Sequence, residues 1–424
     1  MTTTKNNEHK KLNVPNLRFP EFQGEWEKCK LGELTTKVGS GSTPKGGNAV
    51  YTSVGHCFVR SQNVGMGYLI LDDIAHIDDD IHQKHKATEL NEDDVLLNIT
   101  GASIGRTAIA TKEIEGGNVN QHVCIIRANS KVSPKFLCNY IQTKKIQNYI
   151  QSLQTGGSRE GLNFEQIRSF PISLPNIAEQ NKNAQLLDKL NERIATQNKI
   201  IEDLKKLKSA IIEKVFCSPN QECPICRVEG FEQPLTTYKM NDFCSRIATK
   251  NKDAKCSLVL TIAAQYGLVN QESFFNKSVA SENLTGYYLL HKGEFAYNRS
   301  YSAGYDWGAV KRLDNYDEGV LSTLYICFKI NETIVDSDYL TYYFESTKWH
   351  RGLSDIAGEG ARNHGLLNVS MTDYFNTKHR FPVIEEQKAI VKMLNAITEK
   401  ERKATMLGEC FQKQKQYLLR QMFI

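Results

Sequence analysis

Several features that define other classes of protein are absent from this sequence. No run of about eighteen apolar residues occurs, so we expect no membrane-spanning helix. The opening segment MTTTKNNEHKKLNVPN is polar and lacks the apolar stretch of a secretory signal. The 11 cysteines are scattered, and without a signal they are expected to be reduced thiols, not a disulfide framework. These absences predict a cytoplasmic protein with no membrane partner.

Motifs for catalysis are absent as well. The sequence has no glycine-rich cofactor fingerprint opening a helix, no nucleophile elbow and no HExxH metal motif. It also lacks the Asp/Asn-Pro-Pro-aromatic string with which amino-methyltransferases hold a flipped base. The loop KVGSGSTPKGG, from Lys37, is not a phosphate loop, because no lysine with Ser or Thr follows its last glycine. We therefore expect no catalytic residue, metal or cofactor in this chain.

The net charge excludes few classes of binding partner. Lys and Arg number 53 and Asp and Glu 48, a formal net charge of +5 that permits a nucleic-acid partner without requiring one. The apolar content is ordinary, and 424 residues are enough for two or three domains. Acidic residues crowd between Asp72 and Asp94, and we interpret them as a solvated face. Residues 1–15 are expected to be a disordered lead-in.

The string CPIC, from Cys223 to Cys226, has the spacing of half a zinc site, and Cys217 and Cys244 lie nearby in the sequence. No second CxxC or HxxxH follows at the spacing of a zinc finger. We therefore interpret this segment as an interdomain linker. A zinc-dependent enzyme built on these cysteines is the weaker alternative.

The chain contains an internal repeat. LPNIAEQ, which begins at Leu174, returns as FPVIEEQ from Phe381, and Pro175 and Pro382 are 207 residues apart (382 less 175). Upstream, EDDVLLNIT, which ends at Thr100, resembles KGEFAYNRS, and KFLCNYI resembles DYLTYYF. Repeats of this size, roughly 170 globular residues and then a long helix, are duplicated domains and not solenoid units.

Both halves end in a heptad pattern. After each repeated phrase, apolar residues alternate three and four positions apart, which is the signature of a coiled coil. Lys208 and Lys415 occupy the same seam position, where a polar residue costs stability and can fix the register. The predicted seam residues are Leu187, Leu190, Ile194, Ile201, Leu204, Ile211 and Val215 in the first copy and Leu394, Ile397, Phe411, Leu418 and Met422 in the second.

Each long helix is expected to begin just after its proline, Pro175 or Pro382, because a first-turn proline loses no helical hydrogen bond. Glu179, Glu385 and Glu386 fall in the early turns, where the helix dipole favours negative charge. One such helix alone would expose its apolar stripe, and the obvious partner is the other copy. A two-fold axis perpendicular to the helices would make them antiparallel, but the pattern alone leaves parallel pairing open.

Both globular regions have the pattern of mixed α+β domains, with strand-like runs such as DDVLLNI and TLYICFKI separated by turns. Polar residues gather at the turns that follow these runs. Because Arg, Asn and Gln can contact base edges and lysine neutralises phosphate, we predict DNA contacts there. For each residue, ordinary loop polarity is the competing interpretation. The candidates are Arg60, Gln62, Asn63, Arg106, Gln121, His122 and Arg159 in the first region and Asn298, Arg299, Tyr301, Lys311, Arg362 and His364 in the second.

Together these strings resemble the specificity subunits of type I restriction–modification systems. The resemblance rests on the STP turn at Ser42 to Pro44, RSQNV from Arg60 and TGASIGRTAIA from Thr100. It rests above all on the duplicated Pro-x-x-x-Glu-Gln phrase that leads into each heptad helix, and it covers almost the whole chain. The second copy departs from the pattern, since it reads KHRFPVIEEQ without the FPIS lead-in and its seam is less apolar.

The resemblance implies a non-catalytic subunit that binds double-stranded DNA. It implies target-recognition domains over residues 16–174 and 217–381, with antiparallel spacer helices over 175–216 and 382–424. Each domain would read one half of a split, asymmetric target, and the helices would set the spacer. Two methyltransferase subunits would dock on this chain, and restriction subunits would join for cleavage. S-adenosylmethionine, ATP and magnesium would belong to those partners. A coiled-coil scaffold that never touches DNA is the alternative.

Overall fold

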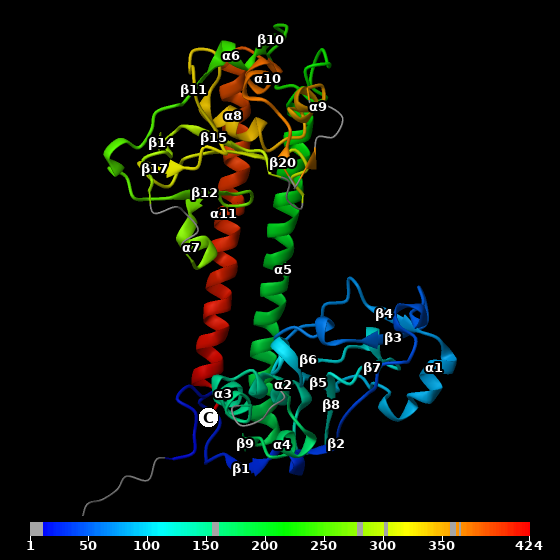
Figure 1. Ribbon diagram of the computed structural model, residues 1–424. Helices are drawn as coiled ribbons and strands as arrows, with labels where there is room; N and C mark the ends of the chain where they lie inside the picture. The colour runs from blue at the N-terminus through cyan, green and yellow to red at the C-terminus, as the bar shows by residue number, and fades with distance from the viewer. Residues whose placement is uncertain (1–11, 155–160, 278–282, 301–303, 357–361, 364–365) are drawn as a thin grey trace, which may run out of the picture. The chain divides into compact units, whose positions relative to one another are not determined.

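The protein is described by a computed structural model that covers residues 12–154, 161–277, 283–300, 304–356, 362–363 and 366–424. The chain divides into two compact units. Unit 1 comprises Met1–Asn198 and Thr405–Ile424, and unit 2 comprises Lys199–Ala404. Each unit contains one globular domain and part of both long helices, α5 (Ile177–Val215) and α11 (Ile384–Gln421), as Figure 1 shows.

The main sheet of unit 1 is antiparallel and four-stranded. Its strands, in spatial order, are β2 (Thr35–Ser40), β8 (Val123–Ala128), β5 (Val95–Asn98) and β6 (Thr107–Ile109). Helix α2 (Pro134–Ile141) covers β5 and β6 because Phe136, Leu137 and Ile141 form one buried apolar face. This packing is the core that holds the loops of unit 1 in place.

Smaller elements complete unit 1. A three-stranded sheet joins β4, β3 and β7, and a two-stranded sheet joins β1 to β9. The elements are β1 (Glu27–Lys30), β3 (His56–Val59), β4 (Ala75–Ile77), α1 (Asp79–Lys84), β7 (Asn118–Val119), α3 (Lys144–Ser152), α4 (Phe164–Arg168) and β9 (Pro171–Leu174).

The main sheet of unit 2 repeats the plan of unit 1. Its strands, in spatial order, are β11 (Cys244–Arg246), β18 (Ile326–Ile330), β15 (Phe295–Asn298) and β16 (Ala309–Arg312). When the four strands of a main sheet are numbered in chain order, their spatial order is first, fourth, second, third in both units. Helix α8 (Ser337–Tyr343) packs against β16 as α2 packs against β6. The predicted α+β class and the internal repeat are confirmed.

The remaining elements of unit 2 are short. Strands pair as β10 with β21, β12 with β13, β14 with β17 and β19 with β20. Their bounds are β10 (Thr236–Lys239), α6 (Met240–Phe243), β12 (Leu260–Ala263), β13 (Gly267–Asn270), α7 (Gln271–Phe275), β14 (Tyr288–His291), β17 (Glu318–Leu321), α9 (His350–Ser354), β19 (Arg362–Asn363), β20 (Leu366–Leu367), α10 (Met371–Asn376) and β21 (Lys378–Phe381).

Within each unit the two long helices run antiparallel. In unit 1, Leu187 near the start of α5 shares one hydrophobic core with Leu419 and Met422 at the end of α11. In unit 2, Val215 at the end of α5 shares a core with Leu394 near the start of α11. The start of one helix therefore lies beside the end of the other in both units. The predicted antiparallel pairing is confirmed, and the parallel arrangement is excluded.

The predicted seam faces inward along both helices. Every seam position named from the heptad pattern is buried or half-buried. The polar seam residues reach their own globular domain: Nζ of Lys208 lies 3.6 Å from Glu345 in unit 2. In unit 1, burial lowers the pKa of Lys415. Gly67 has a φ of +90°, a backbone conformation that favours glycine, and a Cβ there would lie 2.6 Å from Oε1 of Gln142 and 2.8 Å from Nζ of Lys415.

A buried ion pair joins the first turn of each long helix to the segment before its globular domain. Glu179 accepts hydrogen bonds from the Arg18 guanidinium at 2.7 and 2.8 Å and from Nε1 of Trp26 at 3.2 Å. In the second copy, Glu386 pairs with Arg227 at 2.8 and 2.9 Å. The two glutamate side chains are only 1% and 2% exposed. They therefore act inside the fold, beyond the dipole role predicted from the sequence.

The glutamines of the repeated phrase make a second set of matched contacts. Gln180 accepts the amide N–H of Ser133, at the start of α2, at 2.8 Å and donates to the carbonyl of Pro175 at 2.8 Å. Gln387 makes the equivalent bonds at 2.8 and 2.9 Å, the second to Pro382. Both long helices begin two residues after these prolines. The prediction that each long helix begins just after its proline is confirmed. The prolines lie before the first turn and not within it, and their carbonyls serve as acceptors there.

Part of the predicted disordered lead-in is ordered. Residues 1–11 lie outside the described residues. Beyond them, Asn13 accepts the backbone N–H of Trp26 at 2.8 Å, and its side-chain amide donates to the Trp26 carbonyl at 2.5 Å. Pro15 is buried. The chain is therefore already fixed from Asn13 onward, because it pairs with a segment that packs under the first turn of α5.

Unit 2 should lose stability in acid through one histidine. His379 is fully buried between Tyr343 and Thr377, and burial lowers its pKa to about 3. The unfolded chain takes up this proton near pH 6.5, so the free energy of unfolding should fall as the pH drops below about 6.5, by up to about 1.4 kcal/mol per pH unit. The variant His379→Gln should show a shallower slope in denaturant titrations between pH 4 and pH 7. An unchanged slope would contradict the assignment.

Candidate nucleic-acid interface

Three loops of unit 1 meet in a chain of polar contacts. The Thr43 hydroxyl donates to Oε1 of Gln121, whose Nε2 lies 3.0 Å from Nε2 of His122. Nδ1 of His122 lies 2.5 Å from Oγ1 of Thr100. Gln121 is exposed and His122 is half-buried. Side chains that neighbours hold in one orientation at the surface are suited to reading base edges.

Of the two predicted arginines of unit 1 that the structure describes, Arg106 is the more accessible. It is exposed, and its guanidinium makes no hydrogen bond or ion pair with any residue in the described part of the chain. Helix α3 supports its loop, because Nε2 of Gln147 donates to the carbonyl of Gly105 at 3.0 Å. An unpaired guanidinium on a supported loop can bind a phosphate or a guanine edge.

The RSQN turn is held together by Asp73. Arg60 donates to the carbonyl of Asp73 at 3.0 Å and lies over the ring of Tyr51 at 5.6 Å, while Gln62 donates to the Asp73 carboxylate. Asn63 is fully buried, and its amide donates to Asp73 at 3.2 Å. Of the three predicted residues, only Gln62 is exposed. We withdraw Asn63 from the candidate contacts, because a buried amide with its hydrogen bonds made cannot reach a base.

The sequence predicted that the acidic segment before β5 is a solvated face, but the structure shows that part of this segment is buried. Asp94 is 1% exposed and binds the Arg127 guanidinium through two hydrogen bonds of 2.7 Å. Asp78 caps helix α1 by accepting the N–H of Ile81 at 2.8 Å. A buried carboxylate of this kind is paired because an isolated charge would be too costly to remove from water. These acids therefore support the fold of unit 1.

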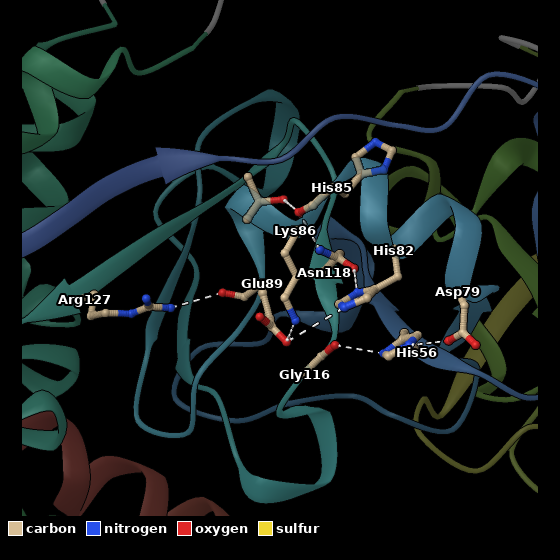
Figure 2. Close-up of polar contacts among 10 residues, drawn as sticks. His56, Asp79, His82, His85, Lys86, Glu89, Gly116, Asn118 and Arg127 are labelled. Carbon is tan, nitrogen blue, oxygen red and sulfur yellow. Dashed lines mark hydrogen bonds and ion pairs between the residues drawn. The ribbon is translucent and has the colours of Figure 1, made fainter.

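A histidine cluster links α1 to the small sheet, as Figure 2 shows. The rings of His56 and His82 stack with centroids 3.7 Å apart. Nε2 of His56 lies 2.8 Å from Asp79, and Nδ1 of His82 lies 2.8 Å from Oδ1 of Asn118. Nε2 of His82 lies 3.8 Å from Glu89. Each ring thus has protein partners, and the cluster positions α1.

A hollow of about 380 Å³ marks the surface of unit 2. It lies between the turn of the β12–β13 hairpin, helix α7 and the end of β15, and it includes Gln265, Tyr266, Phe274, Asn298 and Ser300. Tyr266 is 70% exposed and Phe274 is 46% exposed. Aromatic side chains that stay in water beside amide groups are suited to apolar contact with a thymine methyl group while the amides bind base edges.

Two cations predicted for the interface of unit 2 are partly buried. Arg299 donates to the carbonyl of Val369 at 3.0 Å and to that of Leu324 at 3.3 Å, so it holds two loops together. Lys311 is half-buried, and burial lowers the pKa of its amine, while the negative charge of Glu345 opposes that shift. Lys311 stays a prediction.

The side chains of four further candidates lie outside the described part of the structure. Arg159, Tyr301 and His364 lie outside the described residues. The backbone of Arg362 forms strand β19, which pairs with β20. These four residues stay predictions.

The sequence analysis missed Gln265, Tyr266 and Phe274. A weak signal was present, since Gln265 follows strand β12 in the string IAAQY as Gln62 follows β3 in VRSQN. The turn has Gly267 at a φ of +86°, which a hairpin tolerates most easily with glycine. Only the folded hairpin shows that Tyr266 lies beside α7 and Asn298.

The cysteine pair remains part of a linker. Cys223 and Cys226 are exposed, and Sγ of the buried Cys217 lies 3.3 Å from the carbonyl of Gln221. Among the residues that the structure describes, no group of three or more His, Cys, Asp or Glu side chains could hold a metal ion. Within the same residues, no helix is both long and apolar enough to cross a membrane.

Comparison with known proteins agrees with this architecture. Residues 23–206 match the family model of the type I restriction modification DNA specificity domain. The chain is 22% identical over 412 residues to the type I restriction enzyme MjaX specificity subunit of Methanocaldococcus jannaschii, covering 92% of this chain and 91% of the relative. It is 25% identical over 169 residues to the EcoBI specificity subunit of Escherichia coli, 37% of this chain and 34% of that protein.

Solved structures show the same fold. The S subunit of a type I restriction–modification system from M. genitalium superposes with a TM-score of 0.55 at 14% identity, covering 97% of this chain and 99% of that one. A chain from a study of complex assembly in the type I R-M system gives a TM-score of 0.53 at 15% identity, covering 93% and 96%. These likenesses show a shared fold of two tandem α+β domains, each followed by a long helix. Residues 23–206 thus match a DNA specificity domain, and over most of its length the chain is similar to a type I restriction enzyme specificity subunit.

Proposed function

We propose that each globular domain of this specificity subunit reads one half of a split, asymmetric DNA target. One observation carries the proposal: the two domains share the same main-sheet topology, but the side chains at their loops differ. The main sheets have one strand order, yet unit 1 presents Gln121, His122 and Arg106 at its loops, whereas unit 2 presents Tyr266 and Asn298. Different donors, acceptors and aromatic faces select different bases. The two half-sites should therefore differ.

The long helices would set the spacer between the half-sites. Both α5 and α11 contribute residues to both units, so their length governs the separation of the two reading surfaces. Two domains that each bind a short half-site give one specific interaction when they are linked. Binding of the first domain raises the effective concentration of the second half-site near the second domain. A scaffold that never touches DNA does not account for the match to a DNA specificity domain.

The chemistry would come from other subunits. We propose that this chain is non-catalytic and binds no cofactor, and that two methyltransferase subunits dock on it with restriction subunits in the full complex. S-adenosylmethionine would bind the methyltransferase subunits, and ATP and magnesium would serve the restriction subunits. We also propose that this assembly works in the cytoplasm. The names of the similar specificity subunits support these partners.

The proposal is tested by selection from a random duplex pool in the presence of the methyltransferase partner. We expect enrichment of two short, different sequences separated by unread bases. The affinity for the selected duplex should fall steeply with salt, because phosphate contacts release counterions. Enrichment of one uninterrupted site, or assembly that is insensitive to salt and to DNA, would contradict the proposal.

Single substitutions should alter one half-site only. Arg106→Ala should relax the selected sequence of one half, and Tyr266→Ala that of the other, each with an affinity loss of about 1–3 kcal/mol for a lost base contact. The measurement is repeated selection, followed by anisotropy titration of the selected duplex.

The matched control is Tyr68→Ala. Tyr68 is also exposed, but its hollow includes Glu113, Asp188 and Glu192, whose negative charge disfavours phosphate. This variant should leave both half-sites unchanged. If Tyr266→Ala alters both halves, or neither, the assignment of the hollow to one half-site fails.

A further inference from the structure

The two copies of the repeat differ in charge at one place. In unit 2, the carboxylate of Glu213 on α5 accepts the N–H of Thr347 at 2.6 Å and its hydroxyl at 2.7 Å. Nζ of Lys348 lies 3.4 Å from the same carboxylate. An amide, a hydroxyl and an ammonium group thus surround one oxyanion, an arrangement of charge-assisted hydrogen bonds. Unit 2 fills this site with its own side chain.

The equivalent position of the second helix carries the opposite charge. The offset of 207 residues that relates Pro175 to Pro382 relates Glu213 to Arg420. The tertiary structure supports this pairing, because Ile212 and Leu419, the residues just before them, are both buried in the cores of their units. Unit 1 therefore lacks the carboxylate that occupies the site in unit 2.

Two of the three groups that bind the carboxylate, the amide and the ammonium group, have counterparts in unit 1, whereas Lys144 replaces the hydroxyl of Thr347. Thr143 donates to the carbonyl of Tyr140 at 2.7 Å, and Ser346 donates to that of Tyr343 at 2.6 Å, so the two hydroxyls mark the same turn. The residues that follow them are Lys144 and Lys145 in unit 1 and Thr347 and Lys348 in unit 2. The amide of Lys144 opens helix α3, whose first N–H groups have no partner within the helix.

These groups border a hollow of about 150 Å³ in unit 1 that includes Lys144, Lys145 and Arg420. Burial is the main cause that lowers the pKa of Lys145, and the positive charge of Lys28 adds to it. Ile424 also borders the hollow, and its carbonyl oxygen accepts the hydroxyl of Tyr140. Among the described residues, no acidic side chain lines the hollow. Several positive side chains therefore converge with no acidic side chain beside them.

We infer that this hollow binds an oxyanion of the phosphate class that comes from outside the chain. The site combines a guanidinium, two ammonium groups and a helix N-terminus, which together favour a multiply charged oxyanion. Free phosphate and the phosphodiester of DNA share this chemistry. Helix α3 also supports the loop of Arg106 through Gln147, so a DNA phosphate bound here would lie on the helix that braces a reading loop. The inference does not depend on which bases are read.

The test uses the full chain and inorganic phosphate, with binding followed by phosphorus NMR at constant ionic strength. Arg420→Glu recreates the arrangement of unit 2 and fills the site with an internal carboxylate. We expect it to weaken phosphate binding about tenfold or more, as the loss of one charge-assisted contact predicts. The matched control is Lys413→Glu, an equal charge change at an exposed position of α11 outside the hollow, which should bind phosphate like the parent.

A second variant distinguishes a loss of phosphate binding from a loss of folding. Lys144→Gln changes another element of the site and should also weaken phosphate binding while helix content stays unchanged. Equal binding by the parent and both site variants would overturn the inference, as would a parent chain that binds no phosphate because its own terminus fills the hollow.

A final arm separates the two sources of phosphate. If a DNA phosphodiester occupies the site, duplex DNA should displace inorganic phosphate from the parent, and Arg420→Glu should reduce the salt dependence of DNA binding by about one counterion. If free phosphate is the ligand, duplex DNA should leave it bound. Both results support an oxyanion site. Because free phosphate binding needs no target sequence, failure here is distinguishable from failure of the proposed DNA recognition.

Discussion

A heptad added to both long helices should lengthen the spacer of the DNA target and leave both half-sites unchanged. Seven residues inserted after Asn198 in α5 and after Ala404 in α11 fall where the chain divides into its two units, so the core of each unit stays intact. Seven residues lengthen a helix by roughly 10 Å, which corresponds to about three base pairs. A heptad preserves the seam, because the apolar pattern resumes in phase.

The effect on the original target should be large. With the reading surfaces moved apart, only one half-site can be engaged at a time, so the affinity gained from linking two sites is lost, by about 100-fold or more. Selection from a random pool should recover the same two half-sites with a longer gap. A changed half-site with an unchanged gap would show that the helices do not set the spacer.

Two insertions of other kinds serve as controls. A heptad in α5 alone leaves the pair unequal in length and should weaken binding to every spacer. A four-residue insertion in both helices shifts the phase of the seam and locally unwinds the coil. It should therefore reduce stability in a way that the heptad insertion does not.

Glu179→Ala should destabilise unit 1 by about 3–5 kcal/mol, the usual cost of removing one partner from a buried ion pair. The substitution leaves the Arg18 guanidinium without its carboxylate and the Nε1–H of Trp26 without an acceptor. Hydrogen exchange measured by mass spectrometry is the suitable readout, because it reports the two units separately where a single melting curve would not. Faster exchange should be confined to unit 1.

The matched control in the same unit is Glu165→Ala. Glu165 forms an ion pair with Arg168 at 2.6 Å, but its side chain is 84% exposed. Exposed pairs contribute about 0–1 kcal/mol, so this variant should exchange almost like the parent. Glu386→Ala should reproduce the large effect in unit 2. Equal effects of Glu179→Ala and Glu165→Ala would show that the buried pair does not hold the first turn of α5 to its domain.

Much of the architecture could be predicted from the sequence because it is encoded locally. The heptad period identified both long helices and their seam, since every apolar position must face the same side. Strand runs and turns identified the α+β class, and repeated strings such as LPNIAEQ and FPVIEEQ revealed the duplication. These features depend on neighbours in the chain, and a periodic pattern reports them directly.

The site could be predicted only in part, because exposure depends on contacts between distant residues. Gln121 and Arg106 are at the surface as expected, whereas Asn63 is buried and Lys311 is half-buried. Tyr266 was overlooked because its importance arises from segments that meet only in the folded domain. A loop residue looks the same in sequence whether its side chain points outward or inward.

The sequence by itself determined that this protein has two related α+β domains, each with a long heptad helix, because local periodicity and repetition specify these features. Only the tertiary structure decided the direction of helix pairing, since a seam alone suits either direction. It also decided the role of the Glu-Gln pairs, whose partners Arg18, Ser133 and Arg227 lie far away in the chain. Long-range contacts carry that information, and no short stretch of sequence contains them.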